Sequence, residues 1–266
     1  MKAKSVILVL LMSFVLVFCK NDDNDSFFPL ELATVKNSVI ASFDSLNHSI
    51  SVAVDQFSQA GIDTTEIRKE LVELYTSSSF ATEFVFTTPE GIMQIIEPPA
   101  YYASQGADIS QQSHVISAFQ TREPVLSNSF MVVEGYLACV DVHPMVNNGQ
   151  ILGTISAVLD PGVMLERILA PIVKDQSFEI WVMEKSGRVI FDQDAEEIGL
   201  NVLTDPLYAD FPELITACRK IANEETGETS YSFYQAGSSR VVKKKTYWNT
   251  FHLYTNEWKI IWVKPE

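Results

Sequence analysis

The side chains that could bind or react with another molecule gather between residues 101 and 143. Asp141 and His143 are the best pair, because residues two apart on a strand project from the same face. Two ligands are too few for a closed metal site. The pair is therefore interpreted either as polar contacts for a small molecule or as a solvated strand end. The other candidates are Tyr101, Tyr102, His114, Arg122 and Tyr136.

Arg122 and the tyrosines suit a pocket that holds a charged small molecule. A guanidinium binds a carboxylate through two parallel hydrogen bonds, and pocket walls are often aromatic with a few polar tips. With Asp141, Arg122 would offer opposite charges to a ligand. The alternatives are a surface arginine at a helix C-terminus, which the helix dipole favours, and tyrosines in ordinary core packing.

Sequence motifs of enzymes are absent from this chain. It contains no GxSxG, HExxH, Walker or GxGxxG motif, and its four histidines are scattered. Without a CxxC motif, Cys139 and Cys218 are interpreted as small buried apolar side chains. We therefore expect no catalytic residue, metal site or cofactor. A hydrolase that uses Asp141 and His143 stays as an alternative.

The composition excludes some partners. The formal net charge is −15, from 34 acidic and 19 basic residues. Nucleic-acid binding needs a basic surface, and an anionic membrane surface would repel the chain. The only basic run, Lys243 to Lys245, predicts an exposed edge strand protected by lysine or a docking patch for an anionic partner.

Residues 1–19 have the features of an export signal. Lys2 and Lys4 precede an apolar run, Val6 to Phe18, which is shorter than the roughly 20 residues of a spanning helix. Cys19 follows the run and precedes a polar tether, residues 20–28. Two readings remain open: a lipoprotein signal lipidated at Cys19, and an uncleaved N-terminal anchor. Either one places the body of the protein outside the cytoplasm, attached to the membrane.

The next segment, residues 29–76, is predicted to be helical. A second helix is expected from Thr64, after a break at Gly61. Apolar residues recur there at steps of three and four, forming one stripe. They are Val35, Val39, Phe43, Leu46, Ile50 and Phe57.

The rest of the chain contains the same order of elements twice, in residues 77–173 and 174–266. Each part reads as a β-hairpin, a helix and three strands, and the spacing from Gly91 to Asp108 nearly equals that from Gly187 to Asp205. This order predicts an internal duplication and an α+β fold with two antiparallel sheets. The four tryptophans fall in the second part and are interpreted as core.

Several stretches resemble the double Cache (dCache) sensor family, whose modules are PAS-like. They are Trp181 to Asp192, Ile198 to Asn201, Asp205 to Tyr208, Gly227 to Phe233, Asn256 to Ile260, and His143 to Met145 with Gly149 to Gly153. The resemblance covers roughly residues 30–264. It implies an extracytoplasmic binding protein whose ligand lies in the first, membrane-distal module and whose signal passes through the long helix and the second module.

The resemblance also limits the ligand. Amino-acid-binding members carry a tryptophan in the first module and an aspartate near the end of its last strand. The first module of this chain contains no tryptophan, and Val158 stands at the position of the aspartate. An organic acid or amine is therefore expected. We expect the chain to have no output domain of its own, and therefore to report to a separate membrane partner or simply to capture its ligand. The alternative is a structural or assembly lipoprotein that binds another protein.

Overall fold

The computed structural model describes residues 28–174, 176–254 and 256–266. The signal segment, the tether up to residue 27 and Cys19 lie outside the described residues. The helices are α1 (Leu30–Ala60), α2 (Thr64–Ser77), η1 (Pro99–Ser104), α3 (Ser113–Thr121), α4 (Pro161–Val173), η2 (Pro206–Tyr208) and α5 (Pro212–Asn223).

Two antiparallel sheets follow the helical segment. The first contains β1 (Ala81–Thr87), β2 (Met93–Glu97), β3 (Val125–Leu126), β4 (Phe130–Met131), β5 (Leu137–Asn147) and β6 (Gln150–Leu159). The second contains β7 (Glu179–Glu184), β8 (Val189–Phe191), β9 (Thr226–Tyr234), β10 (Val241–Leu253) and β11 (Asn256–Pro265).

The strand orders of the two sheets match. The first reads β2-β1-β6-β5-β3, with β4 paired to β5, and the second reads β8-β7-β11-β10-β9. In each sheet the hairpin pairs with the last strand of its module, and that strand pairs with the strand before it. The predicted α+β class, a long helix followed by two antiparallel sheets with flanking helices, is confirmed.

Helix α1 forms because its apolar stripe is buried along the whole helix. The six stripe residues named above are between 0 and 6% exposed. The helix ends at Gly61, whose φ of 91° suits glycine. Helix α2 starts at Thr64, as predicted, but its N-cap is Asp63, whose side chain accepts hydrogen bonds from the amides of Thr65 and Glu66 at 2.9 and 3.3 Å.

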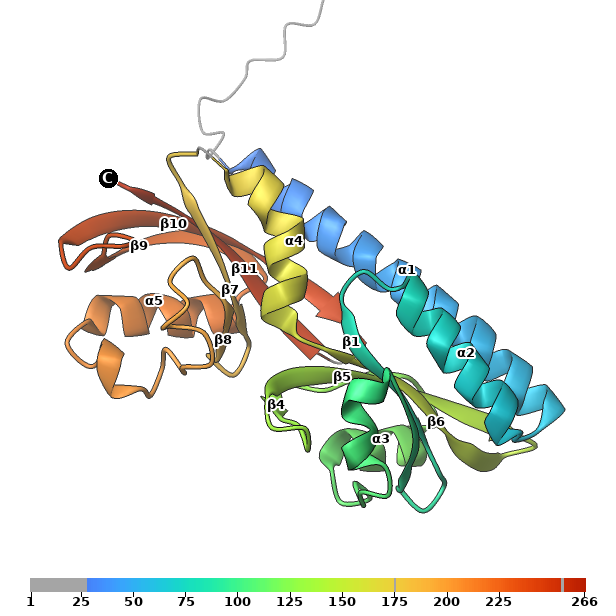
Figure 1. Ribbon diagram of the computed structural model, residues 1–266. Coiled ribbons are helices and arrows are strands. Elements are labelled where there is room, and N and C mark those ends of the chain that lie inside the picture. The colour runs from blue at the N-terminus through green and yellow to red at the C-terminus, as the bar shows by residue number, and fades with distance from the viewer. Residues whose placement is uncertain (1–27, 175, 255) are drawn as a thin grey trace, which may run out of the picture.

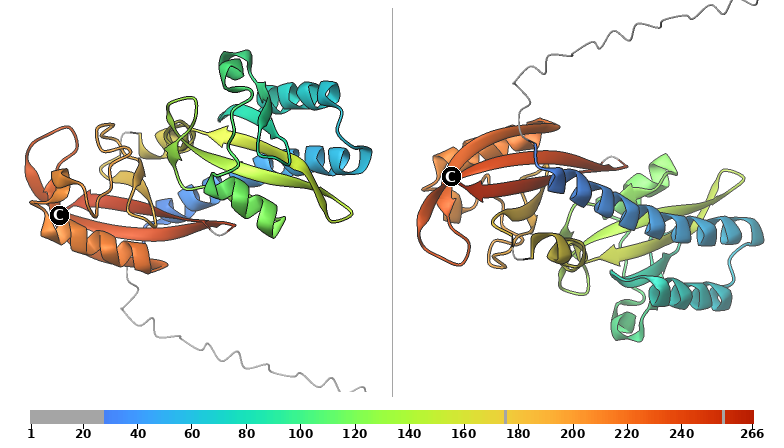
Figure 2. Two further views of the ribbon diagram at one scale, coloured as in Figure 1. Left: turned by 90° about the horizontal axis from the view of Figure 1, so that it is seen from below. Right: turned by 90° about the horizontal axis from the view of Figure 1, so that it is seen from above.

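Helix α1 packs on both sheets, as Figures 1 and 2 show. Near its start, Lys36 Nζ lies 3.1 Å from Asn249 Oδ1 of β10. The Phe43 ring lies 5.5 Å from the rings of Phe251 and Trp258, and α1 also contacts β5 and β6 of the first sheet. One apolar core therefore runs through α1, α4 and the inner faces of both sheets.

The outer face of each sheet has a separate core. Helix α3 covers the first sheet with Val115 and Ala118, and α5 covers the second with Leu214 and Ile221. These outer layers are independent of α1, so each sheet has a layer of loops and a short helix on the side away from the long helix.

Three predicted elements differ from the structure. The helix expected from Asp108 starts only at Ser113, and the one expected from Asp205 is divided into η2 and α5 before Pro212. The run from Val125 to Val133 forms two strands of two residues each.

The predicted edge strand at Lys243 to Lys245 is wrong. Strand β10 lies between β11 and β9, so it has partners on both sides. Lys244 is buried, 4% exposed, whereas Lys243 and Lys245 point to the opposite face and pair with Glu266 and Glu228. The lysine run therefore lies on an inner strand of the sheet, where only Lys244 is buried.

Cys139 and Cys218 are buried and free, as interpreted from the sequence. Of the helices that the structure describes, none has the length and hydropathy to cross a membrane.

Candidate functional site

The seven predicted site residues do not converge on one cavity. Asp141 and His143 lie on β5 with the same parity as Cys139 and Met145, which belong to the core shared with α1. Both side chains are buried, and His143 Nε2 lies 3.2 Å from Asp141 Oδ1 and 3.3 Å from the Tyr254 hydroxyl. This cluster lies between the two sheets, away from their outer pockets.

Arg122 and Tyr102 lie on the surface. Arg122 is the exposed C-cap of α3, with a left-handed φ of 61°, which fits the helix-terminus alternative. Tyr102 is 37% exposed, and its hydroxyl donates to Glu97 at 2.6 Å and contacts Arg68 at 2.8 Å. Because Asp141 faces inward and Arg122 faces solvent, these two charges cannot hold one ligand together.

His114 lines a small pocket on the outer face of the first sheet, called here the first-sheet pocket. Its volume is about 30 Å³, and its walls are mostly apolar, with Val85, Phe130 and Val140 among them. The imidazole lies 5.1 Å from the Phe130 ring, and burial lowers the pKa of His114 to about 4. His114 is therefore neutral near pH 7.

Tyr136 and Tyr101 lie beside this pocket, around an acid that the sequence analysis did not identify. Tyr136 donates a hydrogen bond of 2.9 Å to Glu83 Oε1, and the Tyr101 and Tyr136 rings are 6.1 Å apart. Glu83 is fully buried, and burial followed by the charge of Glu134 raises its pKa to about 7. Among the described residues, Glu83 Oε2 and Glu134 Oε1 have no hydrogen-bond partner.

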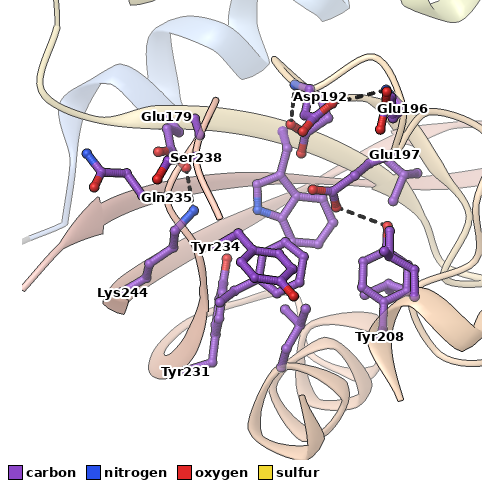
Figure 3. A pocket seen from close by; sticks show the side chains of 18 of the residues that line it. Glu179, Asp192, Glu196, Glu197, Tyr208, Tyr231, Tyr234, Gln235, Ser238 and Lys244 are labelled. Atoms are coloured by element: carbon purple, nitrogen blue, oxygen red, sulfur yellow. Dashed lines mark hydrogen bonds and ion pairs between the residues drawn. The ribbon is translucent and has the colours of Figure 1, made fainter. Parts of the chain in front are cut away.

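A larger cavity, of about 220 Å³, lies on the outer face of the second sheet, and it is called here the second-sheet cavity. The sheet forms its floor, the segment after β8 and η2 form one side, and the β9–β10 loop forms another (Figure 3). Its position corresponds to that of the first-sheet pocket, because both lie opposite the α1 face.

Aromatic rings form much of the wall of the second-sheet cavity. They are Trp181, Tyr208, Tyr231, Phe233 and Tyr234. The rings support one another: Tyr208 and Phe233 have centroids 5.8 Å apart, and Phe233 and Tyr234 5.2 Å apart. Alternation on β9 directs Tyr231 and Phe233 to this face of the sheet.

Five carboxyl groups and one lysine line the same cavity. The acids are Glu179, Asp192, Asp194, Glu196 and Glu197, and the lysine is Lys244. Lys244 Nζ is 2.7 Å from Glu179 Oε2, so its charge is already compensated. Within the described residues, no ion pair reaches the other four acids.

Two of these acids have raised pKa values. Burial, followed by the charge of Glu197, raises the pKa of Asp192 to about 7, although the Asp194 amide donates to Asp192 Oδ1 at 2.8 Å. Burial also raises the pKa of Glu197, whose Oε2 accepts a 3.0 Å hydrogen bond from Tyr208. Perturbed carboxyls in an aromatic cavity are features of a ligand site.

The sequence analysis missed this cavity, although one signal was present. Four acids fall within six residues, from Asp192 to Glu197, between a strand and a helix. The interpretation of the four tryptophans as core residues is confirmed, since all four are buried, but Trp181 also lines the cavity.

Comparisons with known proteins agree with this architecture. A family described as "HK/GC/Chemotaxis protein-like, sensor domain" matches residues 41–161. An extracellular ligand-binding receptor from Desulfohalobium retbaense is 25% identical with a TM-score of 0.75, over 89% of this chain and 40% of that one. This chain thus spans well under half of that receptor. The chain is therefore similar to chemoreceptor-type sensor domains, and it has the fold expected from the resemblance to double Cache proteins.

Two further structures share the double Cache fold at lower identity. The ligand-binding domain of the Pseudomonas aeruginosa amino acid chemoreceptor PctC, in complex with GABA, is 14% identical with a TM-score of 0.62, over 88% of this chain and 96% of that one. The periplasmic sensory domain of the Campylobacter jejuni chemoreceptor Tlp1 is 13% identical with a TM-score of 0.61, over 89% and 92%. No curated protein sequence matches the chain.

Residues 41–161 thus match a sensor domain of the histidine-kinase and chemotaxis type, and the fold of the chain is that of chemoreceptor ligand-binding domains.

Proposed function

We propose that this chain senses a small molecule outside the cytoplasmic membrane, and that the second-sheet cavity is its binding site. The observation that carries the proposal is the cavity itself, of about 220 Å³, lined by aromatic rings and by five carboxyls, of which Glu179 alone forms an ion pair within the described chain. The volume is below the roughly 300 Å³ at the lower end of pockets for drug-sized ligands. A small metabolite is therefore the expected class.

The first-sheet pocket is the second candidate position. The family resemblance favours the first module, and His114, Tyr101 and Tyr136 lie in or beside this pocket. However, about 30 Å³ corresponds to roughly one water molecule. A ligand there would require the pocket walls to move apart, whereas the second-sheet cavity is already open.

Location outside the cytoplasm is supported by the export signal in residues 1–19 and by relatives described as extracellular or periplasmic. Attachment would come from a lipid on Cys19 or from an uncleaved anchor. In this proposal the chain binds without turnover and reports to a separate membrane partner or captures its ligand. The assembly-lipoprotein alternative predicts a co-purifying protein in place of a metabolite.

The placement of the site is tested with the purified full chain and a thermal-shift screen of organic acids, amines and amino acids. At 100 times its dissociation constant, a ligand should stabilise the protein by about 2.7 kcal/mol. Leu214→Phe, which fills the second-sheet cavity, should remove that shift. Val140→Phe, which fills the first-sheet pocket, is the matched control and should retain it.

The reverse pattern would place the ligand in the first-sheet pocket. If no compound shifts the wild type and a stable protein partner co-purifies, the assembly alternative replaces the sensing proposal.

A further inference from the structure

We propose that the ligand of the second-sheet cavity is a small organic cation, held by Asp192 and Glu197 against the aromatic wall. This inference rests on the proposed function, because it assigns a chemical class to the same cavity. It follows from the charge of the lining, the arrangement of the rings and the size of the space.

The charge of the lining is unbalanced toward the negative. Five carboxyl groups face one ammonium, and Glu179 already pairs with that Lys244 ammonium at 2.7 Å. A buried carboxylate without a cationic partner is costly, because protein replaces the water that would solvate it. A positively charged ligand would supply the missing partner.

The two acids proposed to hold the ligand are well placed for this role. Glu197 and Asp192 both line the cavity from the segment at and after the end of β8, and Tyr208 holds Glu197 through a 3.0 Å hydrogen bond (Figure 3). Within the described residues, the Asp194 amide donates to Asp192 Oδ1, which leaves Asp192 Oδ2 available to a ligand. Burial raises the pKa of both acids, and neighbouring carboxylates add to the shift: Glu197 for Asp192, and Asp194 for Glu197.

The rings favour an organic cation. A cation within about 6 Å of an aromatic centroid is attracted by the negative face of the ring. Phe233 already has such a contact, because Lys244 Nζ lies 5.9 Å from its centroid. Trp181, Tyr208, Tyr231 and Tyr234 offer further rings around the same space.

A metal ion fits the cavity less well. Among the residues that the structure describes, no group of three or more His, Cys, Asp or Glu side chains is arranged to hold one. Aromatic walls supply no metal ligands, whereas they suit the methylene or methyl groups around an ammonium. A small amine or quaternary ammonium has both the positive charge that would pair with the carboxyls and the apolar groups that would contact the rings.

The probes are choline and n-butylammonium, with 3,3-dimethylbutan-1-ol as the uncharged isostere of choline and butanoate as the anion. Binding to the full chain is measured by thermal shift and calorimetry at pH 8, where Asp192 is ionised. We expect at least one ammonium probe to raise the melting temperature in a saturable manner. The alcohol and butanoate should have no comparable effect.

Two isosteric variants test the assigned residues. Asp192→Asn and Glu197→Gln should each weaken ammonium binding at least tenfold, because each removes a negative charge without changing the shape of the cavity. Asp210→Asn is the matched control, since Asp210 is exposed in the same module and lies outside the cavity lining. It should bind as the wild type does.

Acid should also weaken the binding, because protonated Asp192 cannot pair with a cation. Affinity should fall as the pH is lowered through about 7, and less so in Asp192→Asn. The titratable or charged groups that line the cavity with Asp192 are Glu179, Asp194, Glu196, Glu197, Tyr208, Tyr231 and Lys244.

The outcomes separate this inference from the proposed function. If only the alcohol or butanoate binds, and Leu214→Phe removes that binding, the cation class is overturned and the cavity remains a ligand site. Ammonium binding that survives both Asp192→Asn and Glu197→Gln would also overturn the class. If no probe binds, and the wider screen finds no ligand that Leu214→Phe removes, both proposals are overturned.

Discussion

The hydroxyl of Tyr208 donates a 3.0 Å hydrogen bond to Glu197 Oε2, and the two residues come from segments on either side of a turn. Tyr208 belongs to η2, and its fully buried ring packs on Phe233 of β9. The bond therefore ties the acidic segment after β8 to the second sheet. It positions one carboxylate of the second-sheet cavity through a residue that is itself immobilised by packing.

Phe43→Ala should destabilise the protein by about 3–5 kcal/mol, because it removes a fully buried ring that contacts Phe251 and Trp258. Chemical denaturation measures the change. Val52→Ala, at a position 54% exposed on the same helix, is the control and should change the free energy of unfolding by less than about 0.5 kcal/mol. Equal stability of Phe43→Ala and wild type would contradict the packing of α1 on the second sheet.

His114 should make the protein sensitive to acid. Its pKa is about 4 in the folded state against an ordinary 6.5, so the unfolded chain binds the proton more readily between these values. The neutral His114 side chain therefore contributes its full stabilisation above about pH 6.5, and this contribution to the free energy of unfolding is lost as the pH falls toward 4. At about 1.4 kcal/mol per unit, the loss is roughly 3 kcal/mol.

The measurement for His114 is the free energy of unfolding of His114→Leu minus that of the wild type, between pH 4 and 7.5. This difference should become more positive as the pH falls, because the wild type loses stability and the variant does not. His48→Leu is the control, since His48 is an exposed residue of α1. A pH-independent difference for His114→Leu would show that the imidazole is protonated without cost in the folded state.

Asp192 should have the opposite effect when no ligand is bound. Its folded pKa of about 7 is above the ordinary 3.8, so the native state binds the proton more tightly and stability falls as the pH rises between these values. Asp192→Asn lacks this loss. Relative to the wild type, it should gain up to a few kcal/mol between about pH 4 and 7. Thermal melts across this range, with Asp210→Asn in parallel, would detect the gain, and parallel pH profiles of Asp192→Asn and wild type would rule it out.

Cys19→Ser should abolish incorporation of a labelled fatty acid and release the protein from the detergent phase, if Cys19 is lipidated. Cys139→Ser is the control, because Cys139 is buried in the core. Equal labelling of Cys19→Ser and wild type would favour the uncleaved anchor. The other residues of the chain are unchanged in both variants, so the comparison isolates the thiol.

The local sequence contained most of the information about the elements. The apolar stripe through Val39 and Phe43 predicts a long helix with one buried face, since its period matches the helical repeat. The repeated order of hairpin, helix and strands predicts two similar antiparallel sheets, and the structure confirms them. These features depend on short-range periodicity and turn residues, which are visible in one sequence.

The position of the side chains across the sheets was decided only by the tertiary structure. Asp141 and His143 share a strand face as predicted, but only the packing of α1 and the second sheet shows that this face is the inner one. Lys244 illustrates the same point, because the pairing of β10 with both β9 and β11 buries a residue that sequence alone assigned to an edge. The second-sheet cavity depends on Asp192, Tyr208, Tyr231 and Lys244, which are far apart along the chain. Strand order and loop packing bring them together, and a single sequence does not encode those long-range contacts in any local pattern.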